Sequence, residues 1–176
     1  MTSAAQPDPR LQQAAGTWTL DPSATSIELR TKAMWGLVKV KAVFAANSGE
    51  AVIGSDGTTR GSLVVDPASV DSGVKKRDAH LRTADFLEVE RYPTITYSAT
   101  DATAGPDGTV VVEGTLEVHG TARPLRVPVS IAELDQTSAT ITAEVDMDRR
   151  EWGLSWAKMG AKVDNHITVR ARFTKQ

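Results

Sequence analysis

Apolar and polar residues alternate with a period of two through most of the chain from Gly16 onward. This spacing is typical of β-strands with one buried face, because successive side chains of a strand point to opposite sides. Threonine and valine dominate these runs, as a pleated, half-buried surface favours. The pattern predicts about eight or nine strands. Their apolar positions fall within 18–20, 27–29, 38–44, 61–65, 95–99, 110–118, 125–131, 141–147 and 163–173.

Residues that favour turns gather between these runs. Glycine, asparagine, aspartate and proline cluster at 47–49, 54–57, 105–108 and 119–120, which we interpret as turns. Pro128 falls inside a predicted strand instead. Because proline has no backbone N–H to donate to a neighbouring strand, Pro128 indicates a sheet edge or a bulge.

One segment breaks the alternation. Residues 74–91 carry helix formers, with Leu81, Ala84 and Leu87 at helical spacing, and Tyr92-Pro93 ends the pattern. We expect a short helical insert at about 74–90 that acts as a lid or plug. Leu81 and Phe86 are its expected contacts with the strands, since most of the surrounding residues are charged.

Many antiparallel strands with one apolar face must pair with a second sheet or close on themselves. The long predicted strands and the single insert favour an all-β, antiparallel closed barrel over residues 16–176. Barrels of about eight strands either fill their interior with side chains or hold one small apolar ligand. The alternation alone leaves both readings open.

The first fifteen residues lack this pattern. They contain no apolar run of signal-peptide length, and Pro7, Asp8 and Pro9 disfavour regular structure. We expect residues 1–15 to form a flexible tail whose removal changes stability little. No stretch is long and apolar enough to span a bilayer. If Met1 is the native start, these features predict a cytoplasmic protein.

Composition narrows the function classes. The 20 Lys and Arg against 22 Asp and Glu give a net charge of −2, without the basic excess that nucleic-acid binding needs. The chain has no cysteine, which excludes disulfides, thiolate metal sites and cysteine nucleophiles. Its 176 residues suit one domain.

Catalytic and metal-binding signatures are missing from the sequence. The three histidines, His80, His119 and His166, have no metal-ligand spacing, and no nucleophile elbow, P-loop or dinucleotide motif occurs. We therefore expect no metal site and no catalytic residue. An enzyme stays an alternative, with His80, Asp78 and Arg149 as its plausible polar groups.

Two connections are unusually apolar. The segment 149–160 contains Trp152, Trp156 and Met159, and a second pair, Met34 and Trp35, precedes a predicted strand. Such side chains can form an adaptable rim at a barrel mouth, or they can plug one end of the core. The sequence does not separate these two interpretations.

Two smaller features also allow two interpretations. Gly61 and Gly114 lie on apolar strand faces, where they either leave room for a ligand or mark a coiling point of the strand. The basic run 75–77 either attracts an anionic group or is a solvated start of a helix.

Three ordered blocks of the sequence contain specific motifs, which say more than the composition does. The first is V-D-P-A-S-V-D-S-G-V-K-K-R-D-A-H-L-R-T-A-D-F-L-E-V-E-R-Y-P-T-I-T-Y, from Val65 to Tyr97. The second is V-E-G-T-L-E-V-H-G-T-A-R-P-L-R-V-P-V, from Val112 to Val129, and the third is Asp148-Arg149 followed by Glu151-Trp152-Gly153. They resemble the R-D-x-H-L and Y-P-x-I-x-F signature, the G-x-L-x-x-x-G-x-x-x-P hairpin and the D-R-x-D-F-G element of the YceI-like, polyisoprenoid-binding family. The resemblance runs from about Gly16 to Thr174.

The resemblance implies an extended, lipocalin-like barrel that holds a polyisoprenoid or isoprenoid quinone without catalysis. The implied partner is an apolar lipid; no nucleic acid and no cofactor beyond a bound long-chain lipid are expected, and a homodimer stays open. The main alternative is an interaction module with a packed interior. The candidate ligand-binding residues come from the apolar strand faces, the insert and the two apolar connections: Leu29, Met34, Trp35, Phe44, Leu63, Phe86, Ile95, Tyr97, Leu116, Val129, Ile131, Trp152, Trp156 and Met159.

The chain departs from the family pattern at three places. Ala24-Thr25 stand where relatives often have histidine-serine, and Met34 lies near a position where they often have histidine. Phe86-Leu87 stands in place of the Phe-Phe pair of the family triplet, so Leu87 replaces the second phenylalanine. Any role that these family histidines play in relatives does not transfer to this chain.

Overall fold

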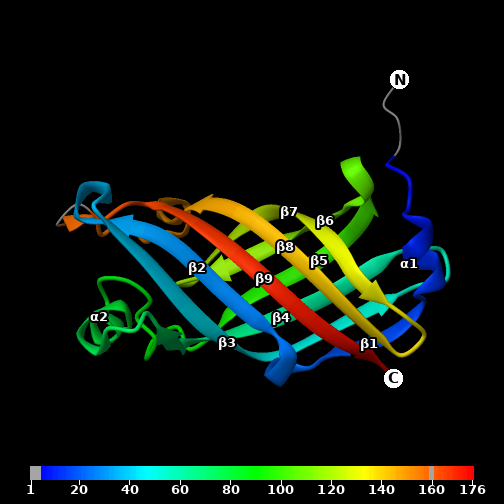
Figure 1. The fold of residues 1–176 in the computed structure, drawn as a ribbon, viewed down its shortest axis with the longest axis horizontal. Helices are drawn as coiled ribbons and strands as arrows, with labels where there is room; N and C mark the ends of the chain where they lie inside the picture. The colour runs from blue at the N-terminus through cyan, green and yellow to red at the C-terminus, as the bar shows by residue number, and fades with distance from the viewer. Residues whose placement is uncertain (1–4, 159–160) are drawn as a thin grey trace.

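A computed structural model describes residues 5–158 and 161–176. Its strands form one antiparallel sheet in the order β1-β3-β2-β9-β8-β7-β6-β5-β4, and a further β3–β4 pairing closes it (Figure 1). β2 to β9 thus form a closed eight-stranded barrel, and β1 shares the place of β2 between β3 and β9. The elements are α1 (Pro9–Gln13), β1 (Gly16–Leu20), η1 (Pro22–Ala24), β2 (Ser26–Ala33), η2 (Met34–Gly36), β3 (Val38–Ile53), β4 (Thr59–Asp71), α2 (Lys75–Leu81), β5 (Ile95–Ala104), η3 (Pro106–Gly108), β6 (Val110–Val118), β7 (Thr121–Leu134), β8 (Ser138–Asp148), η4 (Arg149–Trp152) and β9 (Asp164–Lys175).

The predicted all-β barrel is confirmed, and each predicted strand is present. One predicted turn is wrong. Residues 47–49 lie inside β3, beside register shifts in its pairing with β4 between Val43 and Ala45 and between Ala46 and Ser48. Gly49 permits close packing there, because a Cβ atom at this position would lie 2.9 Å from Cβ of Leu20. A turn-like sequence thus marks an irregular strand pairing.

The prediction for Pro128 is confirmed. It pairs with Val111 of β6, whereas the ladder between β7 and β8 begins one residue later, at Val129. Pro128 therefore lies on a locally free edge of β7, where a missing backbone donor breaks no ladder hydrogen bond.

The N-terminal segment requires a correction. Residues 9–13 form α1, which begins after an Asp8 cap whose side chain accepts a hydrogen bond from the backbone N–H of Arg10. Leu11 is buried against Ala102 and Val110. The expected flexible tail over residues 1–15 therefore does not hold for residues 9–15, because one leucine is enough to anchor a short helix.

The insert between β4 and β5 contains a shorter helix than expected. α2 ends at Leu81, and turns continue to Arg91. Asp78, which is buried, accepts hydrogen bonds from the backbone N–H and hydroxyl of Ser72. In the described part of the chain, no helix is long and apolar enough to cross a membrane.

The barrel has two different ends along its long axis (Figure 1). The α1 end carries α1 and the hairpin turns 54–58, 105–109 and 135–137. The loop end carries the η2 tip (34–37), the insert (72–94) and the β8–β9 connection (149–163). These three segments come from distant parts of the sequence and lie at the same end of the barrel (Figure 1).

Candidate functional site

The barrel interior is lined by apolar side chains. Ile27 of β2 lies opposite Phe44 of β3 and Val169 of β9, so their side chains share the inner face. Several side chains packed against this cluster keep accessible surface even though they face inward. These partly buried residues are Phe44, Leu63, Ile95, Ile141, Ile167, Val169 and Phe173. A fully packed interior would bury such side chains completely.

The candidate binding residues on strands gather in this interior. Phe44, Leu63 and Ile95 pack on the central cluster, whereas Tyr97 and Leu116 pack on a second cluster nearer the loop end. Ile131 packs on the third cluster, which includes Leu11. Leu29 lies opposite Ala42 and Ile167, and Val129 lies opposite Val110 and Ala143. The alternation thus identified the inward face. The list of candidate binding residues nevertheless omitted five members of the same pattern, which are Ile27, Ile141, Ile167, Val169 and Phe173.

The two glycines on apolar faces do not leave room for a ligand. A Cβ atom at Gly114 would lie 2.5 Å from the carbonyl oxygen of Ser98 and 2.7 Å from Oη of Tyr97. At Gly61 it would lie 2.6 Å from the carbonyl oxygen of Glu50. Both glycines therefore allow close approach of the neighbouring strand, and Gly114 makes space for the Tyr97 ring.

Tyr97 brings a polar group into the inner wall. Its hydroxyl donates a hydrogen bond of 2.8 Å to the carbonyl oxygen of Leu125 on β7. Burial, with a smaller contribution from the Glu113 carboxylate, raises the pKa of Tyr97 to about 12. The phenol therefore stays protonated at neutral pH and serves the wall as a hydrogen-bond donor.

The sheet separates at two places near the loop end, and the first lies between β4 and β5. Their ladder joins residues 61–65 to residues 95–99, so the end of β4 runs beyond it. Arg82 of the insert donates hydrogen bonds to the carbonyl oxygens of Ala68 and Val70 on this free stretch. The insert also reaches the β6–β7 turn, where Nε2 of His119 lies 3.0 Å from Oε2 of Glu88. The insert therefore covers the stretch of β4 that lies beyond its pairing with β5.

The second separation lies between β7 and β8. Their ladder covers residues 129–134 of β7, and the preceding part of β7 pairs with β6 alone. Trp152 of η4 fills this region: its side chain is 1% exposed, and its indole N–H donates to the carbonyl oxygen of Leu116 at 2.8 Å. It packs with Met147 and Leu154. For Trp152 this arrangement matches the plug interpretation of the apolar connection.

Trp156 has different surroundings from Trp152. It is partly buried, and its ring centroid lies 4.8 Å from that of Phe86 and 4.9 Å from that of His80. Phe86 and His80 belong to the insert, so the insert and the β8–β9 connection touch each other here. Leu87 packs on the cluster around Trp152. Leu81, Phe86 and Leu87 are all partly buried, so Leu87 joins the two apolar residues that the sequence singled out in the insert.

The three polar groups considered for catalysis are engaged in other contacts. Arg149 is 5% exposed and donates hydrogen bonds to the carbonyl oxygens of Leu154 and Lys162. Burial lowers the pKa of the Arg149 guanidinium, with Arg150 adding to this shift and Asp148 opposing it. Nε2 of His80 lies 2.7 Å from Oδ2 of Asp85. These are the contacts of groups that hold the connections in place.

The pKa of Asp78 is set by opposing effects. Burial raises it, but hydrogen bonds from Ser72 and the nearby charges of Arg82 and Arg77 outweigh burial and lower the pKa below the usual value.

Over residues 5–158 and 161–176, no group of three or more histidine, aspartate or glutamate side chains is arranged to hold a metal ion.

The remaining candidates lie at the η2 tip and in the β8–β9 connection. Met34 and Trp35 are 47% and 72% exposed, and neighbouring Leu37, which the sequence interpretation omitted, is 84% exposed. The run Met-Trp-Gly-Leu was the signal that includes it. Met159 lies outside the described residues. The η2 tip thus points its apolar side chains into solvent instead of into the barrel.

Curated relatives match part of the chain. It is 38% identical over 61 residues to a UPF0312 protein of Vibrio cholerae, which is 35% of this chain and 32% of the relative. It is 36% identical over 64 residues to a UPF0312 protein of Ectopseudomonas mendocina, which is 36% of this chain and 34% of the relative. The match therefore spans about a third of the length of these relatives.

Solved structures share the fold over most of the chain. The crystal structure of Burkholderia cenocepacia BcnA has a TM-score of 0.75 at 17% identity, covering 87% of this chain and 98% of BcnA. A polyisoprenoid binding domain from Saccharophagus degradans has a TM-score of 0.74 at 16% identity, covering 90% of this chain and 98% of that domain. At these identities the likeness concerns the fold. The sequence model of the YceI-like domain matches residues 18–174, nearly the whole barrel, so the chain belongs to the YceI-like domain family.

Proposed function

We propose that this protein binds a long-chain apolar lipid, such as a polyisoprenoid or an isoprenoid quinone, inside the barrel and carries or stores it without catalysis. The observation that carries this proposal is the apolar interior, whose inward-facing side chains, such as Phe44, Ile141 and Val169, keep accessible surface. Apolar surface that stays accessible on inward-facing side chains favours an apolar occupant, because burial of that surface is stabilising.

The strength of binding follows from the size of an isoprene unit. Each buried carbon contributes about 0.8 kcal/mol, so one five-carbon unit offers up to roughly 4 kcal/mol before ordering costs. Two or three units therefore suffice for about micromolar affinity without a polar anchor. The fold neighbour described as a polyisoprenoid binding domain supports this choice of ligand class.

A binding role fits the polar groups better than an enzymatic one. The Arg149 guanidinium and the Asp78 carboxylate hold backbone groups, and His80 pairs with Asp85. A catalytic base or acid needs to reach a substrate atom, and these side chains are already engaged in contacts within the connections.

The test of this proposal places a larger side chain into the barrel interior from one strand, β9. Val169 faces inward, whereas its neighbour Thr168 lies opposite Glu28 and Glu144 on the outer face. We would titrate wild type, Val169→Phe and the matched control Thr168→Phe with a fluorescent long-chain polyene, and measure their unfolding in urea. Val169→Phe should weaken binding about tenfold or more, because the larger ring takes the place of about two ligand carbons.

The stability measurement separates the two interpretations of the interior. If the space is open, Val169→Phe should leave the free energy of unfolding nearly unchanged. If the interior is a packed core, the added ring should destabilise the protein by about 1–3 kcal/mol. The latter result, together with no polyene uptake by the wild type, would overturn the proposal in favour of an interaction module.

A further inference from the structure

The η2 tip concentrates exposed apolar side chains at the loop end. Trp35 and Leu37 are 72% and 84% exposed, and Met34 is 47% exposed. Single exposed apolar residues are normal on a protein surface, but three within four residues at a protruding hairpin indicate a contact surface. Met34 and Trp35 also have positive φ angles of 48° and 56°, which bulky residues rarely adopt. A strained backbone thus holds these side chains outward.

The strands that lead to this tip are basic. The hairpin segment 30–41, R-T-K-A-M-W-G-L-V-K-V-K, contains four basic residues and no acidic one, although the whole chain has a net charge of −2. Lys32 lies opposite Lys39, and Arg30 lies opposite Lys41. All four alternate with inward-facing residues such as Leu29 and Val40, so they lie on the outer face.

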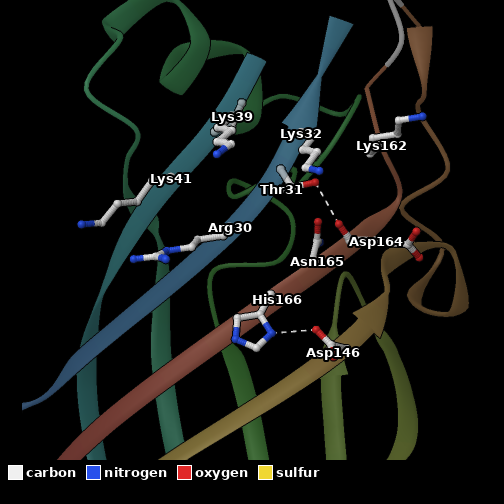
Figure 2. Close-up of a pocket in the computed structure, with 11 residues that line it drawn as sticks. Arg30, Thr31, Lys32, Lys39, Lys41, Asp146, Lys162, Asp164, Asn165 and His166 are labelled. Carbon is white, nitrogen blue, oxygen red and sulfur yellow. Dashed lines mark hydrogen bonds and ion pairs between the residues drawn. The ribbon is translucent and has the colours of Figure 1, made fainter. Parts of the chain in front are cut away.

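These cations line a groove of about 680 Å³ beside β2, β3 and β9, to which Lys162 of the β8–β9 connection and the buried residues Val40 and Asn165 also contribute (Figure 2). The groove contains five basic side chains and two carboxylates, those of Asp146 and Asp164. Arg30 and Lys41 share the Glu28 carboxylate at 2.6 and 3.3 Å. Among the described residues, Lys32, Lys39 and Lys162 have no ion-pair partner, so the groove keeps a positive excess next to the tip.

We propose that the η2 tip and its basic flanks dock the loop end onto an anionic phospholipid bilayer. Aromatic and aliphatic side chains insert at the level of the lipid head groups, and lysines beside them attract anionic lipids. The apolar tip and the cationic groove are adjacent, since the backbone N–H of Lys162 donates to the carbonyl oxygen of Lys32. This inference goes beyond ligand binding in the barrel and does not depend on what the barrel holds.

Tryptophan fluorescence gives a direct readout of docking. Trp35 is the exposed indole, whereas Trp18 and Trp152 are 3% and 1% exposed and Trp156 is partly buried. Vesicles of phosphatidylcholine with about 30% phosphatidylglycerol should bind the protein and shift its emission to shorter wavelength. Vesicles of pure phosphatidylcholine should bind it with an affinity at least about tenfold lower. Trp35→Phe should keep binding, measured by sedimentation with vesicles, but lose most of the spectral shift.

Paired variants test the two parts of the surface. Trp35→Ala with Leu37→Ser should weaken vesicle binding at least about tenfold, because the inserted apolar area is lost. Lys32→Ala with Lys39→Ala should weaken it about 30-fold at low salt. The matched controls, Val52→Ser for apolar exposure and Arg60→Ala with Arg126→Ala for charge, lie outside the groove and should bind like the wild type.

Three results would overturn the proposal. The first is a wild type that does not bind anionic vesicles although its melting temperature is normal. The second is equal binding by the tip variants and the controls. The third is a wild type that sediments as a dimer and becomes a monomer in Trp35→Ala, which would assign the tip to contact with a second copy. Because the vesicles contain only phospholipid, none of these results bears on polyene uptake by the barrel.

Discussion

The two ends of the barrel differ in how far their apolar side chains are buried. At the α1 end, Leu11 is buried against the hairpins, and the indole N–H of buried Trp18 donates to the carbonyl oxygen of Ala14. At the loop end, Trp35 and Leu37 face solvent, and Trp156 is only partly buried. Folding is stabilised by the first arrangement and gains nothing from the second. Under the proposed function, we expect an apolar ligand to exchange through the loop end.

The loop end itself combines both kinds of environment. Trp152 and Trp156 lie four residues apart in one connection, yet the first closes a gap between β7 and β8 and the second lies against the insert. The same residue type thus serves as a plug in one place and as a half-covered contact in the other. Substitution of each tryptophan should separate these roles.

The largest effect is expected at Trp152. Trp152→Ala should lower the free energy of unfolding by about 3–5 kcal/mol, because it leaves a cavity and removes the hydrogen bond from the indole N–H to the carbonyl oxygen of Leu116. Trp156→Ala should lower it by only about 1–2 kcal/mol, since its ring is partly exposed. Urea unfolding of both variants measures the contrast. Equal losses would show that the connection is one packed unit.

The α1 end should also depend on apolar packing. Leu11→Ala should destabilise the protein by about 2–3 kcal/mol, because Leu11 is buried against Ala102 and Val110. Gln13→Ala, on the exposed side of α1, should change stability by less than about 0.5 kcal/mol. Thermal unfolding of the two variants provides the comparison, and a neutral Leu11→Ala would mean that α1 does not close this end.

The wall between the two ends should respond to alkaline pH through Tyr97. Its pKa is raised to about 12, so the folded state holds the phenolic proton more tightly than the unfolded state does. The resulting stabilisation is complete below pH 10 and is lost as the pH rises toward about 12. We expect a loss of about 1–2 kcal/mol over this range that is absent in Tyr97→Phe, after allowance for partial exposure. Identical pH profiles in urea unfolding would contradict this assignment.

A smaller effect on stability but a clear one on binding is expected at the loop end. Trp156→Ala should weaken polyene binding by about 1–3 kcal/mol if this side chain borders the path of the ligand. Trp156→Phe should remove most of the fluorescence quenching that a bound quinone causes, because Trp18 and Trp152 are buried elsewhere in the wall. Saturable binding with unchanged quenching would place the path away from Trp156.

The sequence predicts the barrel well because period-two alternation reports directly which face of each strand is buried. It predicts less where one residue decides the structure: Leu11 anchors α1 within a segment that otherwise looks like a tail. Asn47-Ser48-Gly49 has turn composition but lies within a long strand with shifted register. Local composition does not contain the tertiary pairing that makes this difference.

The candidate site also has a part that the sequence predicts and a part that it does not. Inward-facing residues such as Phe44 and Leu63 follow from alternation. The apolar connections do not, because Trp152 and Trp156 are the same residue type, and their burial depends on where β7 and β8 separate. The basic flanks of the η2 tip were also missed, although four basic residues are visible in the segment 30–41. Only Lys162 joins them through the fold.

The central claim is that the interior holds a long-chain apolar lipid. The most direct measurement is organic-solvent extraction of protein purified without detergent from its native host, followed by mass spectrometry of the extract. We predict a long-chain isoprenoid compound at about one per chain in the wild type and in Thr168→Phe, and strong depletion in Val169→Phe. An empty wild-type extract, or the same mixture of membrane phospholipids from all three proteins, would contradict the account.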